Sequence, residues 1–362
     1  MGTPRSYFNK TVVFFFFLVS SLNGAVFIES SNLYSNEVVV KLPSGREYLS
    51  QKKGGQDLTE GDFSWYGEVQ GEKKGFLSYA KVSETFHGSL SFAGGGFFEI
   101  SGASANLLIE LKKPEQRMGC GVCKEVKSSS HLPPDPRMRA QPVKSWRNGD
   151  ANLIDLLIVY PTAVKSEAGG ATEVEARIAG AVSDANLCYL NSRVSMQLRV
   201  VHTAEINYTP SGNLDLELSR LQTKNDGYFD EIHNLRDQYG ADLVCMLTTT
   251  SNAGGLASTM THPKMSFESS GFNVNVWDQL GAPSYTLAHE IGHNMGCLHN
   301  REDSDWDSTY EFSAFSFGKR WIENGEGYGT IMAYDTSPVS TFPNTVPFFS
   351  NPNVTYLTTA TG

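Results

Sequence analysis

Several features that mark other classes of protein are scarce in this sequence. Its 362 residues include 29 Lys and Arg against 39 Asp and Glu, a net charge of −10. Proteins that bind nucleic acid usually present an excess of basic side chains on one face, so the balance here disfavours that class. No internal repeat is found, and after residue 25 no apolar run approaches the ~20 residues of a membrane-spanning helix. We therefore expect no nucleic-acid partner and no stable membrane insertion.

The first 25 residues have a composition of their own. Basic Arg5 and Lys10 precede the apolar run Thr11–Leu22, and the small residues Asn23, Gly24 and Ala25 follow it. This order is typical of a secretory signal peptide, and the apolar run is too short for a membrane anchor. We expect a secreted, extracellular protein from which residues 1–25 are removed.

Cysteine is also scarce. The sequence has five, an odd number, so at least one is unpaired or pairs outside the chain. Export would permit disulfide bonds. Cys188, Cys245 and Cys297 lie in the C-terminal half and could form one bridge, with partners that the sequence does not identify. Cys120 and Cys123 lie close together, before a change in composition.

Residues 26–123 are expected to form a β-rich domain. Short aromatic or β-branched segments alternate with glycine-containing turns, as in antiparallel sheets. No catalytic constellation occurs in this part, and its one histidine, His87, is expected at the surface rather than at a metal. The predicted strands are Val38–Leu42, Phe63–Val69, Gly75–Tyr79 and Phe97–Ile100.

Residues 124–150 form a polar segment with four prolines and many basic side chains. Such a composition predicts an exposed linker. Arg137, Arg139 and Lys144 would be accessible to a trypsin-like or self-processing cut that severs the tether between the two halves. An uncut spacer remains the alternative.

Residues 151–362 show an α/β pattern. Near-continuous apolar runs predict buried strands, and apolar residues at helical spacing predict helices. The predicted strands are Ile154–Tyr160, Val194–Val201, Ala241–Leu247, Gly254–Ser258 and Phe272–Trp277, and the predicted helices are Thr172–Asn191, Asp226–Tyr239 and Pro283–Gly296. The remaining sequence shows little periodicity.

Thr286–Asn300, TLAHEIGHNMGCLHN, carries the chemistry. On a helix, His289 and His293 project from one face one turn apart, so both imidazoles can hold one Zn²⁺. Glu290 is badly placed to join them as a ligand but well placed as the general base. Gly296 can adopt the left-handed conformation that ends a helix, after which His299 can return as third ligand.

Chance is a poor explanation of this pattern. A bare HExxH arises by accident often enough to be a weak signal of a zinc site. The five fixed positions of HExxHxxGxxH are a much stronger signal. At one residue in twenty per position, a chance match in this chain is on the order of 10⁻⁴. We therefore interpret the segment as a catalytic zinc site.

HExxHxxGxxH is the metzincin signature, and the sequence resembles that clan of zinc peptidases. The resemblance implies a methionine turn downstream, which Gly329–Tyr334 supplies with Met332 as an apolar floor under the imidazoles. Within the clan, residues 151–362 resemble reprolysin-like (adamalysin-related) and bacterial peptidyl-Asp-type metalloendopeptidases. The likeness rests on the zinc helix, the methionine turn and the segments Ile154–Thr162, Gly227–Val244, Phe315–Trp321 and Pro347–Val354.

This resemblance implies a fold and further site residues. The expected fold is α/β, with a twisted, mostly parallel sheet, long helices and an irregular C-terminal subdomain. Gly255, Leu256 and Ala257 would form the edge strand that pairs with extended substrate. In some relatives a tyrosine at the position of Tyr334 contacts zinc or stabilises the oxyanion, and in others it is structural.

Two departures from the reprolysin-like pattern bear on subgroup and stability. Asn300 stands where an aspartate commonly follows the third histidine. The chain ends at Gly362, where relatives usually continue into a C-terminal helix, so it is expected to be truncated at that end.

Arg117–Cys123, RMGCGVC, resembles the cysteine switch of metzincin pro-segments. A thiolate is a good zinc ligand and would displace the water needed for hydrolysis. Cys120 fits this role best and Cys123 is the second choice, while a Cys120–Cys123 disulfide is the alternative. The N-terminal domain would then be a pro-domain that inhibits its own enzyme.

The sequence thus predicts a secreted zinc metalloendopeptidase made as a latent precursor and acting on protein or peptide substrates. A metzincin-shaped binding module or toxin-like ligand with little turnover is the alternative. The intact Glu290 argues against it, because a pure binding module has no need of a base.

Overall fold

The computed structural model describes most of the chain as two packed sheets with helices. The described residues are 27–28, 35–42, 45–58, 61–71, 74–93, 96–103, 106–112, 120, 152–249, 251, 253–261, 263, 265–302, 313–334 and 344–362. The predicted signal peptide, Cys123 and the linker lie outside this range. Within it, no helix combines the length and apolar character needed to cross a bilayer.

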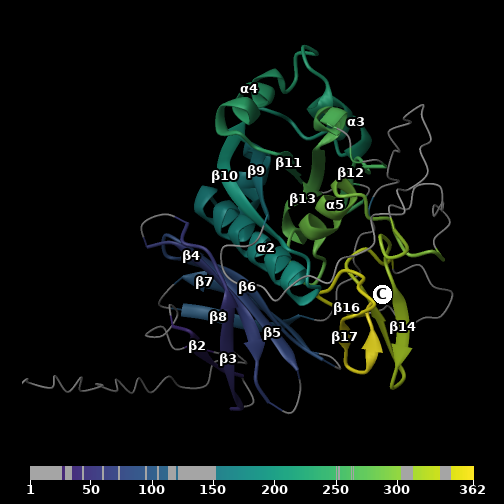
Figure 1. Cartoon of the computed structure of the whole chain (residues 1–362). Coiled ribbons are helices and arrows are strands. Elements are labelled where there is room, and N and C mark those ends of the chain that lie inside the picture. The colour runs from purple at the N-terminus through teal and green to yellow at the C-terminus, as the bar shows by residue number, and fades with distance from the viewer. Residues whose placement is uncertain are drawn as a thin grey trace, which may run out of the picture.

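The N-terminal part is an eight-stranded antiparallel sheet whose strands follow one another in chain order. Figure 1 shows it as one curved layer. The four predicted strands are present, and the sheet contains four further strands that were not predicted. The strands are β1 (Phe27–Ile28), β2 (Glu37–Lys41), β3 (Glu47–Gly54), β4 (Phe63–Val69), β5 (Gly75–Val82), β6 (Thr85–Phe92), β7 (Phe97–Ala103) and β8 (Asn106–Lys112).

The sheet has an apolar core of its own, rich in aromatic side chains. Trp65 and Tyr79 are fully buried and stack with their ring centroids 5.3 Å apart. Phe63 meets Phe86 edge-on at 6.4 Å. Aromatic pairs of this kind stabilise neighbouring strands beyond the area that they bury.

The second sheet has five strands in the order β10-β9-β11-β13-β12. All pairs are parallel except β12 with β13, so the predicted mostly parallel sheet is observed. The strands are β9 (Asn152–Pro161), β10 (Met196–Ile206), β11 (Leu243–Thr248), β12 (Gly255–Ala257) and β13 (Phe272–Val276). The short strand β12 forms one edge.

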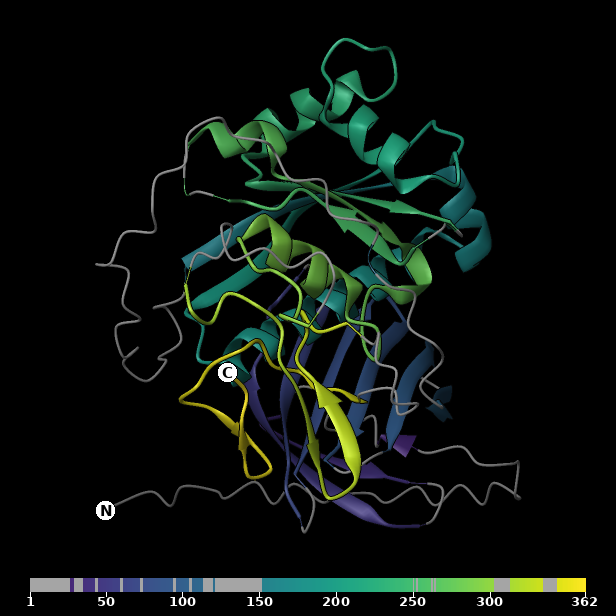
Figure 2. The same ribbon diagram turned by 90° about the vertical axis from the view of Figure 1, so that its right-hand side faces the viewer.

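Helices cover both faces of this sheet, which the alternating side chains of β9 show. Leu156 and Ile158 pack with α2 and α5, whereas Leu157 and Val159 pack with α3 and α4. Figure 2 shows the resulting three layers. The helices are α1 (Thr162–Ala168), α2 (Ala171–Asn191), α3 (Leu214–Gln222), α4 (Asp230–Tyr239) and α5 (Thr286–Asn294), with short 3₁₀ turns at Met265–Ser270 and Trp277–Gln279.

Two predicted helices begin later than expected. The helix predicted from Pro283 starts at Thr286. The helix predicted from Asp226 starts at Asp230, because Gly227 has a left-handed φ of 86° and cannot continue a helix. The carboxylate of Asp230 accepts hydrogen bonds from the backbone N–H groups of Asp226 and Gly227, which closes the turn before the helix.

The C-terminal part is short strands and loops, as its weak periodicity predicts. β14 (Arg320–Glu323) and β15 (Glu326–Gly329) form a hairpin beside β16 (Asn344–Thr345), and β17 (Thr355–Tyr356) pairs with β18 (Thr359–Ala360). Tyr328, Phe348 and Tyr356 from this part pack against Tyr66 and Phe76 of the N-terminal sheet.

The two sheets meet across helix α2, which Figure 1 shows lying between them. His87 on β6 lies at this junction and is only 7% exposed, so the expectation of a surface position is wrong. The sequence around His87 does not reveal that helix α2, which is distant in the chain, packs against this strand and buries the side chain.

Candidate metal centre

Helix α5 places the first two histidines of the signature. It runs from Thr286 to Asn294, and every residue in it is buried. Gly296 follows with a left-handed φ of 89°, so the helix ends there and the chain turns back to His299. His289, His293 and His299 are 1%, 1% and 6% exposed.

The three imidazoles converge through their Nε2 atoms. These atoms are 3.1 Å apart for His289 and His293, 3.2 Å for His289 and His299, and 3.0 Å for His293 and His299. A tetrahedral zinc with bonds of 2.0–2.1 Å has ligand atoms about 3.3 Å apart, close to these separations. The donor set therefore fits a single zinc ion.

Backbone carbonyls select the ring nitrogens that face one another. His289 Nδ1 lies 2.8 Å from the carbonyl oxygen of Ile331, and His293 Nδ1 lies 2.8 Å from that of Cys297. A carbonyl oxygen can only accept, so each Nδ1 carries the proton and each Nε2 keeps its lone pair. Lone pairs that converge in this way need a cation between them.

Glu290 lies beside this cluster and is fully buried. A Cβ added at Gly255 on β12 would stand 2.6 Å from Glu290 Oε1, so the carboxylate occupies space that only a glycine leaves free. The sequence pattern did not reveal this requirement, because Gly255 and Glu290 are far apart in the chain.

Met332, the predicted methionine of the turn, is 1% exposed and packs against helix α5. A Cβ at Gly292, in the middle of α5, would stand 2.4 Å from its sulfur. The helix thus needs glycine at this position to accept the methionine beneath it. Sequence reasoning missed Gly292, although a glycine inside an amphipathic helix is itself a signal of close packing.

Tyr334 also reaches the cluster. Its ring centroid lies 3.7 Å from that of His299, and its backbone N–H donates to the side-chain oxygen of Asn300 at 2.7 Å. The buried Asn300, which departs from the reprolysin-like pattern, thus holds Tyr334 in place. The Tyr334 hydroxyl donates to the backbone carbonyl of Cys120 at 2.7 Å.

Cys120 joins the three histidines in one group whose ligand atoms all lie within 4.8 Å of one another. Its Sγ lies 3.5 Å from Glu290 Oε2 and 3.8 Å from His293 Nε2. Its backbone forms a parallel bridge with Gly255, on the strand expected to bind substrate. The structure therefore brings Cys120 into the site; Cys123 lies outside the described residues.

The bridge expected among the remaining cysteines does not form. Cys188, Cys245 and Cys297 are free thiols among the described residues. Burial raises the pKa of Cys245 to about 12 and that of Cys297 to about 12, and it also raises the pKa of Cys188. These three side chains pack as small apolar groups from different elements, which their spacing in sequence does not reveal.

These features define a buried mononuclear metal site of three histidines with a carboxylate beside it. Residues 150–349 match the reprolysin-like model of metallo-peptidase family M12, and the chain belongs to this family. The family implies a zinc cofactor, which the donor set fits.

Individual relatives agree with this assignment. A peptidyl-Asp metalloendopeptidase of Stenotrophomonas maltophilia is 33% identical over 210 residues, which cover 58% of this chain and 47% of that protein. One of Xanthomonas campestris pv. campestris is 27% identical over 359 residues, covering 90% and 81%. The chain spans about half the length of the Stenotrophomonas relative.

Among solved structures, metalloproteinase-II from Bacteroides fragilis matches 75% of this chain and 86% of its own, at 12% identity and a TM-score of 0.43.

Proposed function

We propose that this chain is a zinc-dependent endopeptidase that hydrolyses protein or peptide substrates and is made as a secreted, latent precursor. The convergence of three Nε2 atoms beside a buried carboxylate supports the peptidase activity. When bound by His289, His293 and His299, zinc would polarise the scissile carbonyl and make water more acidic.

Glu290 is the general base in this proposal. Its Oε2 faces the space beside His293 Nε2, which Cys120 Sγ occupies in this structure. From that position the carboxylate can accept a proton from the attacking water and later deliver it to the leaving amine. The cluster of possible metal ligands among the described residues consists of Cys120 and the three histidines and contains no carboxylate, so Glu290 is left available as a base.

Tyr334 is proposed to hydrogen-bond the substrate carbonyl. Residue 120 forms a parallel bridge with Gly255, and its carbonyl accepts from the Tyr334 hydroxyl. A substrate strand along Gly255, Leu256 and Ala257 would present its own carbonyl to the same donor.

Latency is proposed to rest on Cys120. Its thiol lies beside Glu290 and His293, so the same residue covers the base and competes for the metal. In this arrangement residues 1–25 form the signal peptide, 26–123 the pro-domain, 124–150 the linker with processing sites, and 151–362 the catalytic domain.

Metal analysis and a peptide digest test the activity. We expect about one zinc per chain, and hydrolysis by activated protein that a chelator abolishes and zinc restores. Because the relatives are called peptidyl-Asp metalloendopeptidases, peptides containing aspartate are the first substrates to test. Full activity of metal-free protein would exclude this function.

Glu290→Gln isolates the base from the metal site. The amide keeps the shape of the side chain but cannot take a proton, so zinc content should persist while turnover falls ~10²–10⁴-fold. Glu326→Gln, on the exposed start of β15, is the matched control and should leave turnover unchanged. Zinc binding with no hydrolysis even in the activated parent would favour the binding-module alternative.

A further inference from the structure

Helix α2 is covered from two sides. Fourteen residues of Ala171–Asn191 are buried. One stripe, including Ile178 and Val182, packs on the five-stranded sheet. Another stripe, Ala176 and Ala179, packs against Ala80 and Val82 of strand β5 (Figure 1). The N-terminal sheet therefore supplies part of the environment that buries this helix.

Gly180 shows how closely the helix and the N-terminal sheet approach. A Cβ at this position would stand 3.0 Å from the carbonyl oxygen of His87 on β6. Glycine is an unfavourable residue in the interior of a helix. Its presence is explained by the strand that lies against it.

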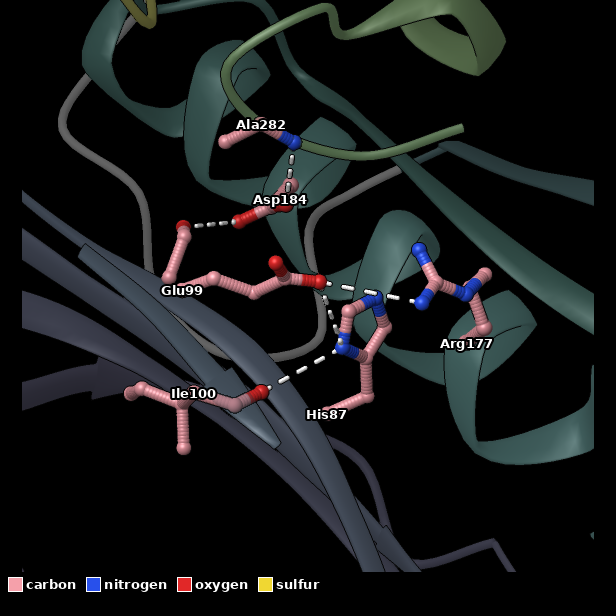
Figure 3. Close-up of polar contacts among 7 residues, drawn as sticks. His87, Glu99, Ile100, Arg177, Asp184 and Ala282 are labelled. Atoms are coloured by element: carbon pink, nitrogen blue, oxygen red, sulfur yellow. Dashed lines mark hydrogen bonds and ion pairs between the residues drawn. The ribbon is translucent and has the colours of Figure 1, made fainter. Parts of the chain in front are cut away.

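Asp184 supplies a polar connection across the same junction. Its carboxylate is 3% exposed and accepts hydrogen bonds from Ser89 Oγ on β6 and from the backbone N–H of Ala282, each 2.9 Å long. Figure 3 shows it between the N-terminal sheet and the loop that leads to the zinc helix. A buried carboxylate needs such donors, so separating the sheet from α2 would remove one of them.

Further contacts widen the junction beyond this carboxylate. Ser183 Oγ donates to the Trp65 carbonyl at 3.2 Å, and Gln56 Nε2 donates to the Leu198 carbonyl at 2.8 Å. Glu99 and Arg177 form an ion pair at 3.7 Å across the junction (Figure 3).

An aromatic contact extends the junction to the C-terminal part. Phe76 of β5 meets Phe348 edge-on with ring centroids 5.6 Å apart. Phe76 belongs to the cluster shared with Tyr328 and Tyr356, not to the sheet's own core. The N-terminal sheet therefore contacts helix α2 and strand β10, early in the C-terminal half, and also Phe348 near its end.

None of these contacts involves residues 121–151. A cut there leaves all of them in place, and it leaves Cys120 covalently joined to the sheet rather than to the zinc helix. A group held on a docked body stays at high effective concentration beside its target.

We propose that the severed N-terminal sheet remains bound to the metallopeptidase domain as a non-covalent partner and keeps Cys120 at the metal centre. A linker cut alone then does not activate the protein, and the sheet itself must be removed. The claim that the cut protein stays inactive rests on the proposed latency. The claim that the severed sheet stays bound does not depend on it.

Co-elution after a linker cut tests the association. A specific protease site is inserted between residues 124 and 150 of the full-length chain, which is then cut and passed through size-exclusion chromatography and native mass spectrometry. We expect one species containing both pieces in a 1:1 ratio. Elution of the two pieces as separate species would overturn the proposal, whatever the activity of either.

Gly180→Leu tests whether the described contact is the anchor. Leucine favours helix in the free domain but collides with the His87 carbonyl in the docked one, so the cut pieces should separate. Thr172→Leu, at an exposed position of the same helix, should still co-elute as the parent does. Co-elution of cut Gly180→Leu protein would overturn the assignment of this surface.

Phe76→Ala provides a second variant if Gly180→Leu does not fold. It truncates a contact of the junction and leaves the sheet's own core intact, so it should also shift the cut pieces towards separate elution. Co-elution unchanged by this variant would count against the same surface.

Peptide hydrolysis by the cut complex independently tests whether Cys120 stays at the metal centre and keeps the protein inactive. The isolated complex should stay inactive until the sheet is digested by a further protease. Full activity of a complex that still co-elutes would show that association holds and that Cys120 is not retained.

Discussion

At the scale of single residues, Cys120 contacts three groups of the proposed active site at once. Its backbone pairs with Gly255, its carbonyl accepts from Tyr334, and its thiol lies 3.5 Å from Glu290 Oε2. One residue thereby covers the edge strand, the proposed carbonyl donor and the proposed base. Such overlap explains physically why a segment of the same chain would exclude substrate.

Cys120→Ser should therefore yield a leaky precursor. A neutral hydroxyl is a much poorer zinc ligand than a thiolate, so hydrolysis by the uncut chain should rise. Thiol-alkylating reagents should likewise activate the parent precursor and have no such effect on the variant. The measurement is peptide hydrolysis by uncut protein in each case.

Cys123→Ser is the matched control for this comparison and should change the precursor less. If both variants stay as silent as the parent, the sheet inhibits by covering the site and neither sulfur is the latch.

At the scale of elements, buried amides couple the zinc helix to the strand that edges the sheet. Asn294 ends α5 and donates to the carbonyl oxygens of Ser258 at 2.9 Å and Phe272 at 3.1 Å. Its own oxygen accepts from Asn273 Nδ2 at 2.8 Å. The backbone N–H of Met260 adds a bond to the His293 carbonyl at 3.0 Å. These hydrogen bonds fix the position of the zinc helix relative to the edge of the sheet.

Asn294→Leu removes the amide from this connection at nearly constant volume. Two carbonyl oxygens and the Asn273 amide would lose their partner in a dry environment, at a cost of ~1–3 kcal/mol for each unsatisfied group. We expect a clear fall in the urea midpoint together with weaker zinc retention during dialysis. Asn353→Leu, at an exposed position, is the control and should match the parent. A parental midpoint in Asn294→Leu would show that the amides do not hold the helix.

At the scale of the whole molecule, the junction of the two sheets buries two groups with opposite responses to pH. Burial, together with the charge of Arg177, lowers the pKa of His87 to about 3, against a hydrogen bond to Ile100 that raises it. Burial raises the pKa of Asp184 to about 6, partly offset by hydrogen bonds from Ala282 and other donors. Figure 3 shows both groups at the junction.

The signs follow from which state binds the proton. Between pH 6.5 and 3 the unfolded chain protonates His87 and the folded chain does not, so stability falls as pH falls. Between pH 6 and 3.8 the folded chain protonates Asp184 and the unfolded chain does not, so this group adds stability as pH falls. Each contribution changes by up to ~1.4 kcal/mol per pH unit, and the two oppose each other between about pH 4 and 6.

Asp184→Asn should accordingly steepen the loss of stability in acid. The variant removes the compensating proton uptake but keeps a side chain that can accept from Ala282, so thermal midpoints at pH 7, 6, 5 and 4 should diverge progressively from those of the parent. His87→Asn should diverge in the opposite direction. Curves parallel to the parent in both variants would mean that neither group is buried as described.

Comparison of sequence and structure shows where local patterns suffice. The segments Ile154–Tyr160 and Thr172–Asn191 have the composition and period of their elements, and β9 and α2 match them within a few residues. The strand Glu47–Gly54, with three charged residues, and the short helix Leu214–Gln222 were not predicted. Their formation depends on neighbouring strands and on packing, which override weak local preference.

The sequence by itself determined the metal centre. Helical spacing places His289 and His293 one turn apart on one face of a helix, and a helix-ending glycine lets the chain turn back so that His299 joins them. It also pointed to Met332 and Cys120 through short motifs. Only the tertiary structure decided that His87 and Asp184 are buried, that Gly255 makes room for Glu290, and that three cysteines remain free. Each of these depends on which distant segments meet, and neither composition nor period encodes the distance between segments that are far apart in the chain.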